Sequence, residues 1–170
     1  VIKLAAAFEA VGIVLLLFAF VPQFGAEGVW VSVFTAISAF CNAGFDLFGR
    51  FGAYSSLVPY VNNYYVQAVI MFMIMAGGLG FMVWVERGEF RKKRRLSLHA
   101  KVVLQFSAIF WVGGAVLLAL LEWSNPKTMG GLSVPSKLMA ALFQSVSTRT
   151  AGMNTIDLAA CGPITKLFMS

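Results

Sequence analysis

The sequence predicts an all-α integral membrane protein made of parallel repeats, each with a spanning helix, a short re-entrant helix and loop, and a second spanning helix. Composition is the first observation: of 170 residues, 59% are hydrophobic and 12% charged, against roughly 25% charged in soluble domains. The second is the presence of three apolar stretches long enough to cross a bilayer. The third is a pair of shorter apolar segments that are versions of each other. Lipid, unlike a soluble core, can accept this much apolar surface.

The three long apolar stretches cover residues 4–21, 66–85 and 102–121. Each is close to the ~20 residues that cross a ~30 Å hydrocarbon core. Glu9 is the charged residue of the first stretch, and we expect its carboxylate to reach the membrane interface. Gly77, Gly78 and Gly80 lie near the end of the second stretch and are expected to permit close helix packing.

Two shorter apolar segments, residues 29–41 and 135–147, are too short to span. About 13 residues of helix measure only ~20 Å. Glu27 lies close to the first turn of one, and Pro135 opens the other, as is typical of helix starts. Each segment is followed by a polar, glycine-containing patch. The pattern predicts two helices that enter the membrane part of the way and then break.

These short segments belong to a repeat. Residues 34–38 align with 143–147 at an offset of 109, and residues 43–44 align with 151–152 at an offset of 108. One residue is therefore lost at the turn from helix to loop. We assign residues 1–90 to the first unit, 91–101 to a basic linker and 102–170 to a second unit. Because residues 164–170 resume an apolar pattern and then stop, we expect the chain to be a fragment.

Positive charge indicates the topology. Seven of the thirteen Lys and Arg residues lie between Arg87 and Lys101, and basic loops near helix ends stay cytoplasmic. With residues 87–101 inside, both polar loops enter from the external face and the repeats run parallel. Inverted-repeat transporters would place corresponding loops on opposite faces.

Irregular backbone at membrane depth is tolerated where it is buried in protein or lines a watery cavity. Lining a pore explains more here, because free carbonyl oxygens can replace water around a cation. Glycine permits the backbone angles that such a loop needs, so Gly44 and Gly152 are the principal candidates. Phe45 and Met153 are expected to wedge behind the loops. The predicted cation filter comprises Asn42, Ala43, Gly44, Phe45, Thr150, Ala151, Gly152 and Met153.

At these loops the sequence resembles a known family. Residues 37–45, Ile-Ser-Ala-Phe-Cys-Asn-Ala-Gly-Phe, resemble the second pore loop of the Trk/Ktr/HKT potassium transporters, and residues 143–154 resemble the third. The resemblance implies four repeats around a pseudo-fourfold pore, with Gly44 and Gly152 as filter glycines. It also implies a gating loop in the helix that begins near Pro163. Cys41 and Met153 depart mildly from the family pattern, where Asn and Phe are common.

The resemblance implies potassium uptake across the plasma membrane, with potassium as transported substrate and no cofactor. Expected partners are membrane lipid, a second copy of the full-length parent and a cytosolic nucleotide-binding regulatory subunit, but no nucleic acid. A secondary transporter with re-entrant hairpins and a non-conducting membrane scaffold subunit remain the alternatives. An enzyme is not indicated, because the catalytic motifs that would predict one are missing from the sequence.

We interpret two further features as structural. Arg149 follows the second short segment and is expected to be a structural support, paired with an acid. The candidate acids are Asp46, Glu122 and Asp157. Cys41 and Cys161 have no metal-type spacing and are expected to be buried thiols.

Overall fold

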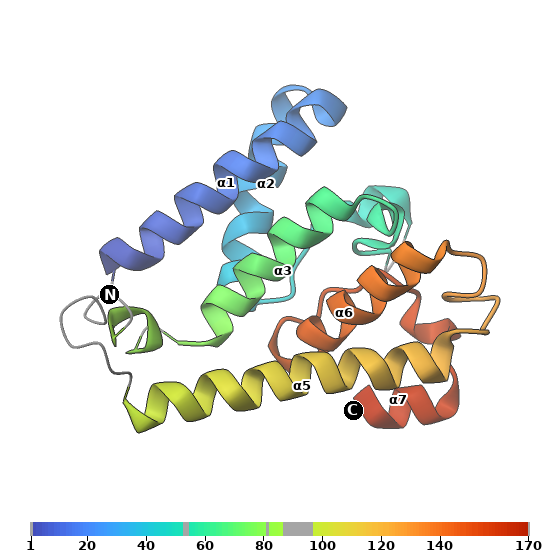
Figure 1. The fold of residues 1–170 in the computed structure, drawn as a ribbon. Helices are drawn as coiled ribbons and strands as arrows, with labels where there is room; N and C mark the ends of the chain where they lie inside the picture. The colour runs from blue at the N-terminus through green and yellow to red at the C-terminus, as the bar shows by residue number, and fades with distance from the viewer. Residues whose placement is uncertain (1, 53–54, 81, 87–96, 170) are drawn as a thin grey trace.

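The computed structural model describes residues 2–52, 55–80, 82–86 and 97–169 (Figure 1). The regular secondary structure of these residues is entirely helical, which confirms the predicted all-α class. The α-helices are α1 (Ile2–Phe24), α2 (Ala26–Phe40), α3 (Tyr64–Gly78), α5 (Leu98–Glu122), α6 (Val134–Thr150) and α7 (Pro163–Met169). Short 3₁₀ helices lie at Phe48–Phe51, Val58–Tyr60 and Leu158–Ala160. Most of the basic segment predicted to face the cytoplasm, residues 87–96, lies outside the described residues.

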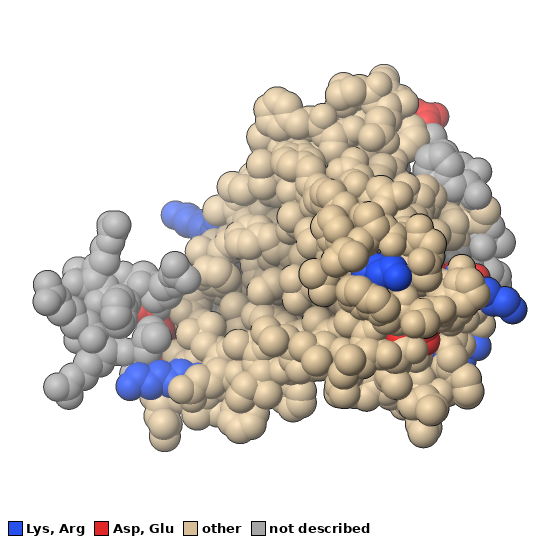
Figure 2. Space-filling model, turned by 45° about the vertical axis from the view of Figure 1, so that its right-hand side comes forward, with Lys and Arg blue, Asp and Glu red and all other residues tan. Residues whose placement is uncertain are grey.

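Two helices contain the first and third predicted spans. With 23 and 25 residues, α1 and α5 are long and apolar enough to cross a membrane by length and composition. The short segments form α2 and α6, of 15 and 17 residues. Proline opens α7, as the sequence predicts, because its missing N–H is not needed in a first turn. Charged side chains are sparse over the surface seen in Figure 2.

The second predicted span, residues 66–85, is not one continuous helix. α3 ends at Gly78, and Gly80 has a φ of 78°, which interrupts the helix before residues 82–86 become helical again. The amide of Gly80 then bonds to the Gly77 carbonyl at 3.2 Å. Trp84 Nε1 donates instead to the carbonyl of Ala76 at 2.9 Å. The indole N–H of Trp84 thus takes the place of the Gly80 amide, which would bond to the Ala76 carbonyl in a continuous helix.

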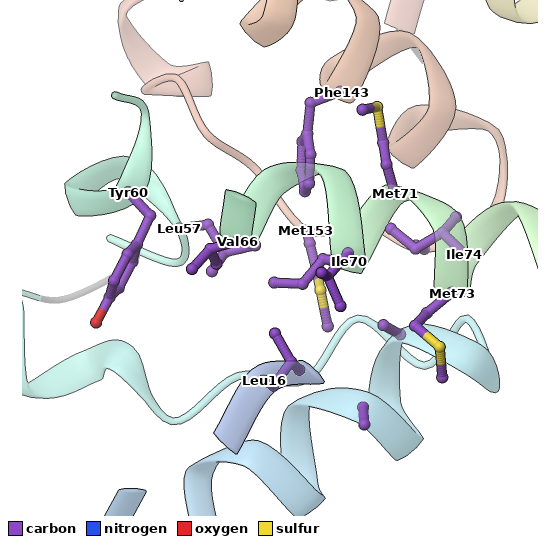
Figure 3. Packing of buried hydrophobic residues seen from close by; sticks show 14 of the residues in the cluster. Leu16, Leu57, Tyr60, Val66, Ile70, Met71, Met73, Ile74, Phe143 and Met153 are labelled. Carbon is purple, nitrogen blue, oxygen red and sulfur yellow. The ribbon is translucent and has the colours of Figure 1, made fainter. Parts of the chain in front are cut away.

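The elements form two units that meet at α3. In the first unit α1 packs along α2, and both contact α3, while in the second α5 packs against α6 and contacts α7. α3 also lies against α6, and so joins the units (Figure 1). The largest hydrophobic cluster includes Leu16 of α1, Ile70 of α3 and Phe143 of α6 (Figure 3). α2 is therefore held between α1 and α3, and α6 between α5 and α3, with the C-terminal end of each directed to the polar loop that follows.

Candidate functional site

Two loops of similar conformation follow the short helices. The first loop, residues 41–47, follows α2, and the second loop, residues 150–157, begins at the last residue of α6. Gly44 has a φ of 76° and Gly152 a φ of 73°, in the left-handed region where a Cβ costs about 1–2 kcal/mol. Both glycines therefore adopt a conformation that other residues reach only with strain.

A serine near the end of each short helix holds the loop that follows it. Ser38 Oγ donates to the carbonyl of Phe45 at 2.6 Å, and Ser147 Oγ donates to the carbonyl of Met153. Each bond ends on the residue after the glycine. The sequence repeat aligns the two serines but does not indicate their acceptors, because a hydroxyl bond across six or seven residues depends on how the loop folds back.

The two loops contact each other next to the helix ends. Thr150 Oγ1 donates to Asn42 Oδ1 at 2.9 Å, although the residues are 108 positions apart. One step further along, Gly44 packs on the carbonyl of Ala151, whose oxygen would lie 2.4 Å from a Cβ built on Gly44. The structure thus brings the two predicted loops together, and glycine at position 44 is required by space as well as by φ.

A third contact between the units lies beyond the loop glycines. The amide of Leu57 donates to the carbonyl of Asn154 at 2.9 Å. The amide of Asn154 in turn donates to Ser56 Oγ at 3.3 Å. The second loop is therefore tied to the segment between α2 and α3, not only to its own helix. This segment carries no feature that singles it out in the sequence.

The loops present carbonyl oxygens for which the described residues supply no donor. Within the described part of the chain, no hydrogen bond ends on the main-chain carbonyl of Asn42, Ala43, Gly44, Thr150, Ala151 or Gly152. Carbonyl oxygens of this kind can take the place of water around a cation. The C-terminal ends of α2 and α6 add partial negative charge beside them. The arrangement is suited to binding a weakly hydrated cation without a carboxylate.

The residues after the two glycines have different surroundings. Met153 is 1% exposed and belongs to the main hydrophobic cluster with Ile70 (Figure 3). Phe45, its equivalent in the repeat, is 69% exposed. The expected wedge behind the loop is therefore present at Met153 and not at Phe45. The reason is that the first unit covers the second loop, whereas no described helix covers Phe45.

Among the described residues, Arg149 pairs with no acid, which differs from the expectation. Its Nη1 donates to Ser107 Oγ of α5 at 2.8 Å, and its guanidinium carbon lies 5.9 Å from the Phe110 ring centroid. The three candidate acids have other partners. Asp46 accepts the amide of Phe48, Asp157 accepts the amide of Ala159, and Glu122 lies in a separate buried network. Arg149 therefore connects the end of α6 to α5 through a hydroxyl and an aromatic ring.

The two cysteines differ in burial. Cys161 is buried, as predicted, and burial raises the pKa of its thiol to about 11. Cys41 is exposed, so the expectation of a buried thiol is wrong there. Its Sγ lies 4.0 Å from Glu9 Oε1. The Glu9 carboxylate is thus directed to the beginning of the first loop.

Of the three glycines predicted to permit close packing, Gly77 packs tightly against the end of α2, whereas a Cβ on Gly80 would meet none of the described atoms within 4 Å, so the prediction is wrong for Gly80. A Cβ on Gly77 would lie 1.8 Å from the carbonyl oxygen of Phe40 and 3.0 Å from Asn42 Nδ2. A Cβ on Gly78 would have 3.7 Å to Thr150 Oγ1, an ordinary contact. The end of α2 therefore rests directly on the backbone of α3.

The whole chain matches a known protein family. The family model described as TrkH, cation transport protein, covers residues 1–170. The potassium/sodium uptake protein NtpJ of Enterococcus hirae is 39% identical over 92% of this chain and 34% of that protein. Ktr system potassium uptake protein B is 38% identical in Bacillus subtilis, over 88% of this chain and 33% of the relative. The protein of that name in Vibrio alginolyticus is 38% identical over 93% and 34%. The chain spans about a third of the length of these relatives.

Proposed function

Since the chain belongs to the TrkH family of cation transport proteins, we propose that its full-length protein takes up potassium across the plasma membrane. The ion passes a selectivity filter to which both loops contribute. Potassium is the transported substrate, and no cofactor takes part. The contributing residues are Asn42, Ala43, Gly44, Phe45, Thr150, Ala151, Gly152 and Met153.

The observation that carries this proposal is the matched pair of loops. Each loop has a glycine with positive φ, a serine that donates to the carbonyl of the residue after that glycine, and carbonyls that accept no hydrogen bond from the part of the chain that the structure describes. A scaffold would not need this conformation twice, and fixed carbonyl dipoles are what a partly dehydrated cation requires. The contact of Gly44 with the Ala151 carbonyl places the loops next to each other.

The relatives support the choice of ion. NtpJ is named a potassium/sodium uptake protein, and the two Ktr proteins are named potassium uptake proteins. Members of the family are membrane proteins. We propose that residues 87–101 face the cytoplasm and that both loops are reached from outside, because the basic residues concentrate in that segment.

We also propose that the full-length protein works with partners. Two relatives are named as parts of a Ktr system, which supports a regulatory subunit for this protein. We propose that this subunit is cytosolic and nucleotide-binding, that the parent protein is a homodimer, and that lipid covers the outer helix faces. Arg149 acts as a structural support behind the second loop through its contacts with α5.

The test is rubidium and sodium uptake into potassium-depleted cells that express the full-length protein, with Gly44→Ser and Gly152→Ser compared at matched membrane abundance. A side chain at φ near +75° costs about 1–2 kcal/mol, and each 1.4 kcal/mol corresponds to about tenfold. We expect the rubidium-to-sodium uptake ratio to fall about tenfold or uptake to be lost in both variants.

Gly113→Ser is the matched control, because a Cβ on Gly113 meets no atom within 4 Å and the residue lies in the helix α5. It should transport like wild type. Unchanged flux and selectivity in both loop variants would contradict the proposal that the loops line a pore. In that case a scaffold or another type of transporter becomes the better interpretation.

A further inference from the structure

The hydrogen bond between Asn42 and Thr150 joins equivalent positions of the two repeats. Each residue stands two positions before its loop glycine, and Thr150 Oγ1 donates to Asn42 Oδ1 at 2.9 Å. The carbonyls of Ala43 and Ala151 follow directly and accept no hydrogen bond from the described residues. This is the nearest side-chain connection between the loops to the two filter glycines.

Asn42 is held in position from its other side. Its φ is 53°, a left-handed conformation that asparagine tolerates better than most residues. Its Nδ2 donates to the Phe40 carbonyl at 3.4 Å. The side-chain amide of Asn42 packs against Gly77 of α3, where a built Cβ would lie 3.0 Å from Nδ2. Asn42 therefore has little freedom to move away from Thr150.

The pair is placed where it can control how far the loops approach each other. Selectivity depends on the positions and number of the carbonyl dipoles that surround the ion. Sodium is smaller than potassium, so binding sodium equally well requires the carbonyls to move inward. A hydrogen bond between the two loops, fixed against α3, opposes such movement. The Ser38 and Ser147 bonds cannot fix the distance between the loops, because each joins a loop only to its own preceding helix.

We propose that the Asn42–Thr150 hydrogen bond is a specificity-determining brace that fixes the spacing of two adjacent filter loops. The proposal rests on the pore function proposed above. It assigns to the Thr150 hydroxyl and the Asn42 amide a positioning role beyond what their backbone carbonyls contribute. Loss of the brace should admit sodium more readily without abolishing rubidium uptake.

The experiment compares Thr150→Val, Thr150→Ser and Thr148→Val in the full-length protein at matched membrane abundance. Valine keeps the shape of threonine and removes the hydroxyl, whereas serine keeps the hydroxyl. Thr148 is the matched control, because its Oγ1 donates to the Gln144 carbonyl of its own helix at 2.9 Å. Rubidium and sodium uptake are measured for each variant.

We expect Thr150→Val to lower the rubidium-to-sodium uptake ratio about 3- to 10-fold, as one hydrogen bond would. Thr148→Val should keep the wild-type ratio, and Thr150→Ser, which retains the hydroxyl, should lower the ratio less than Thr150→Val. Asn42→Gly, which tolerates the positive φ, should lower the ratio similarly. Combining it with Thr150→Val should add nothing further, because both changes remove the same bond.

Two results would overturn the brace. One is a wild-type ratio in Thr150→Val while Gly44→Ser still loses selectivity, which would leave the pore function standing. The other is an equal loss in Thr150→Ser and Thr150→Val, since the hydroxyl would then not matter. If Gly44→Ser and Gly152→Ser are also without effect, the proposed function fails first and the brace fails with it.

Discussion

At the scale of single residues, the hydroxyls of Ser38 and Ser147 have the same role in unequal surroundings. Met153, whose carbonyl accepts from Ser147, is 1% exposed, whereas Phe45, whose carbonyl accepts from Ser38, is 69% exposed. A buried acceptor left without a donor costs about 1–3 kcal/mol, while an exposed one can bond to water. The two serines should therefore differ in their effect on stability.

We predict that Ser147→Ala lowers the free energy of unfolding by about 1–3 kcal/mol and that Ser38→Ala lowers it less. Denaturant unfolding of the purified full-length protein in detergent measures both. Ser32→Ala is the control, because Ser32 Oγ bonds to the Gly28 carbonyl within its own helix, and its loss should lower the free energy of unfolding less than Ser147→Ala. Equal losses for Ser38→Ala and Ser147→Ala would contradict the assignment.

The Cys161 thiol should react slowly with maleimide in the folded protein. Burial raises its pKa from 9.0 to about 11, so the neutral thiol persists to higher pH than in the unfolded chain. Two pKa units reduce the thiolate fraction about a hundredfold at pH 8. We predict that maleimide labels Cys161 at pH 8, in a Cys41→Ser background, at least tenfold more slowly in folded than in denatured protein, with the difference shrinking as pH approaches 11. Equal rates would show that the thiol is not buried.

At the scale of elements, the contact between Gly77 of α3 and the end of α2 leaves no room for a side chain. We predict that Gly77→Ala strongly reduces folding, because its Cβ would lie 1.8 Å from the backbone oxygen of Phe40 and a backbone atom cannot rotate away. Gly78→Ala has ordinary contacts only and should be tolerated. Membrane abundance and thermal stability of the two variants provide the measurement. Tolerance of Gly77→Ala would mean that α2 and α3 are further apart.

Glu122 connects the end of α5 to the start of α7. It is 1% exposed. Its oxygens accept from Asn125 Nδ2 and Thr128 Oγ1, both at 2.7 Å, from the Gly162 amide at 2.9 Å, and from Thr165 Oγ1. A carboxylate suits this position because it is an acceptor only. An amide would direct its own N–H at one pair of these donors.

We therefore predict that Glu122→Gln lowers the free energy of unfolding by about 1–3 kcal/mol, because the new N–H faces one donor that cannot accept, the amide of Asn125 or of Gly162, while the threonine hydroxyl beside it can turn to accept. Thr128→Val removes a single bond of the network and should lower it by about 1 kcal/mol. The same denaturant titration compares them. A smaller loss for Glu122→Gln than for Thr128→Val would show that the network does not hold α7 in place.

At the scale of the whole molecule, the two ends of α5 should lie on opposite sides of the membrane. Its 25 residues measure ~37 Å at ~1.5 Å per residue. Lys101 lies near its start and Lys127 follows its end, and both are exposed. In a Cys41→Ser background, we predict that an impermeant maleimide added to intact cells labels Lys127→Cys and not Lys101→Cys. Permeabilised cells provide the control, in which both should react, and labelling of Lys101→Cys from outside would reverse the proposed topology.

The sequence by itself determined the family, the all-α class, the two long spans α1 and α5 and the short helices α2 and α6. These features are local: apolar length, helix-opening residues and a repeated loop are all written in consecutive residues. The break in α3 could not be found this way. Glycines permit close packing as well as a break, and the donation from Trp84 to Ala76 exists only once the chain has turned at Gly80.

Only the tertiary structure decided which loop atoms meet. The contacts of Thr150 with Asn42 and of Gly44 with the Ala151 carbonyl join residues more than a hundred positions apart, and they follow from how α3 and α6 pack. The same packing buries Met153 and leaves Phe45 exposed, and it gives Arg149 a serine in place of an acid. The physical reason is that composition and periodicity act within one element, whereas the position of a side chain opposite its partner depends on the packing of several helices at once.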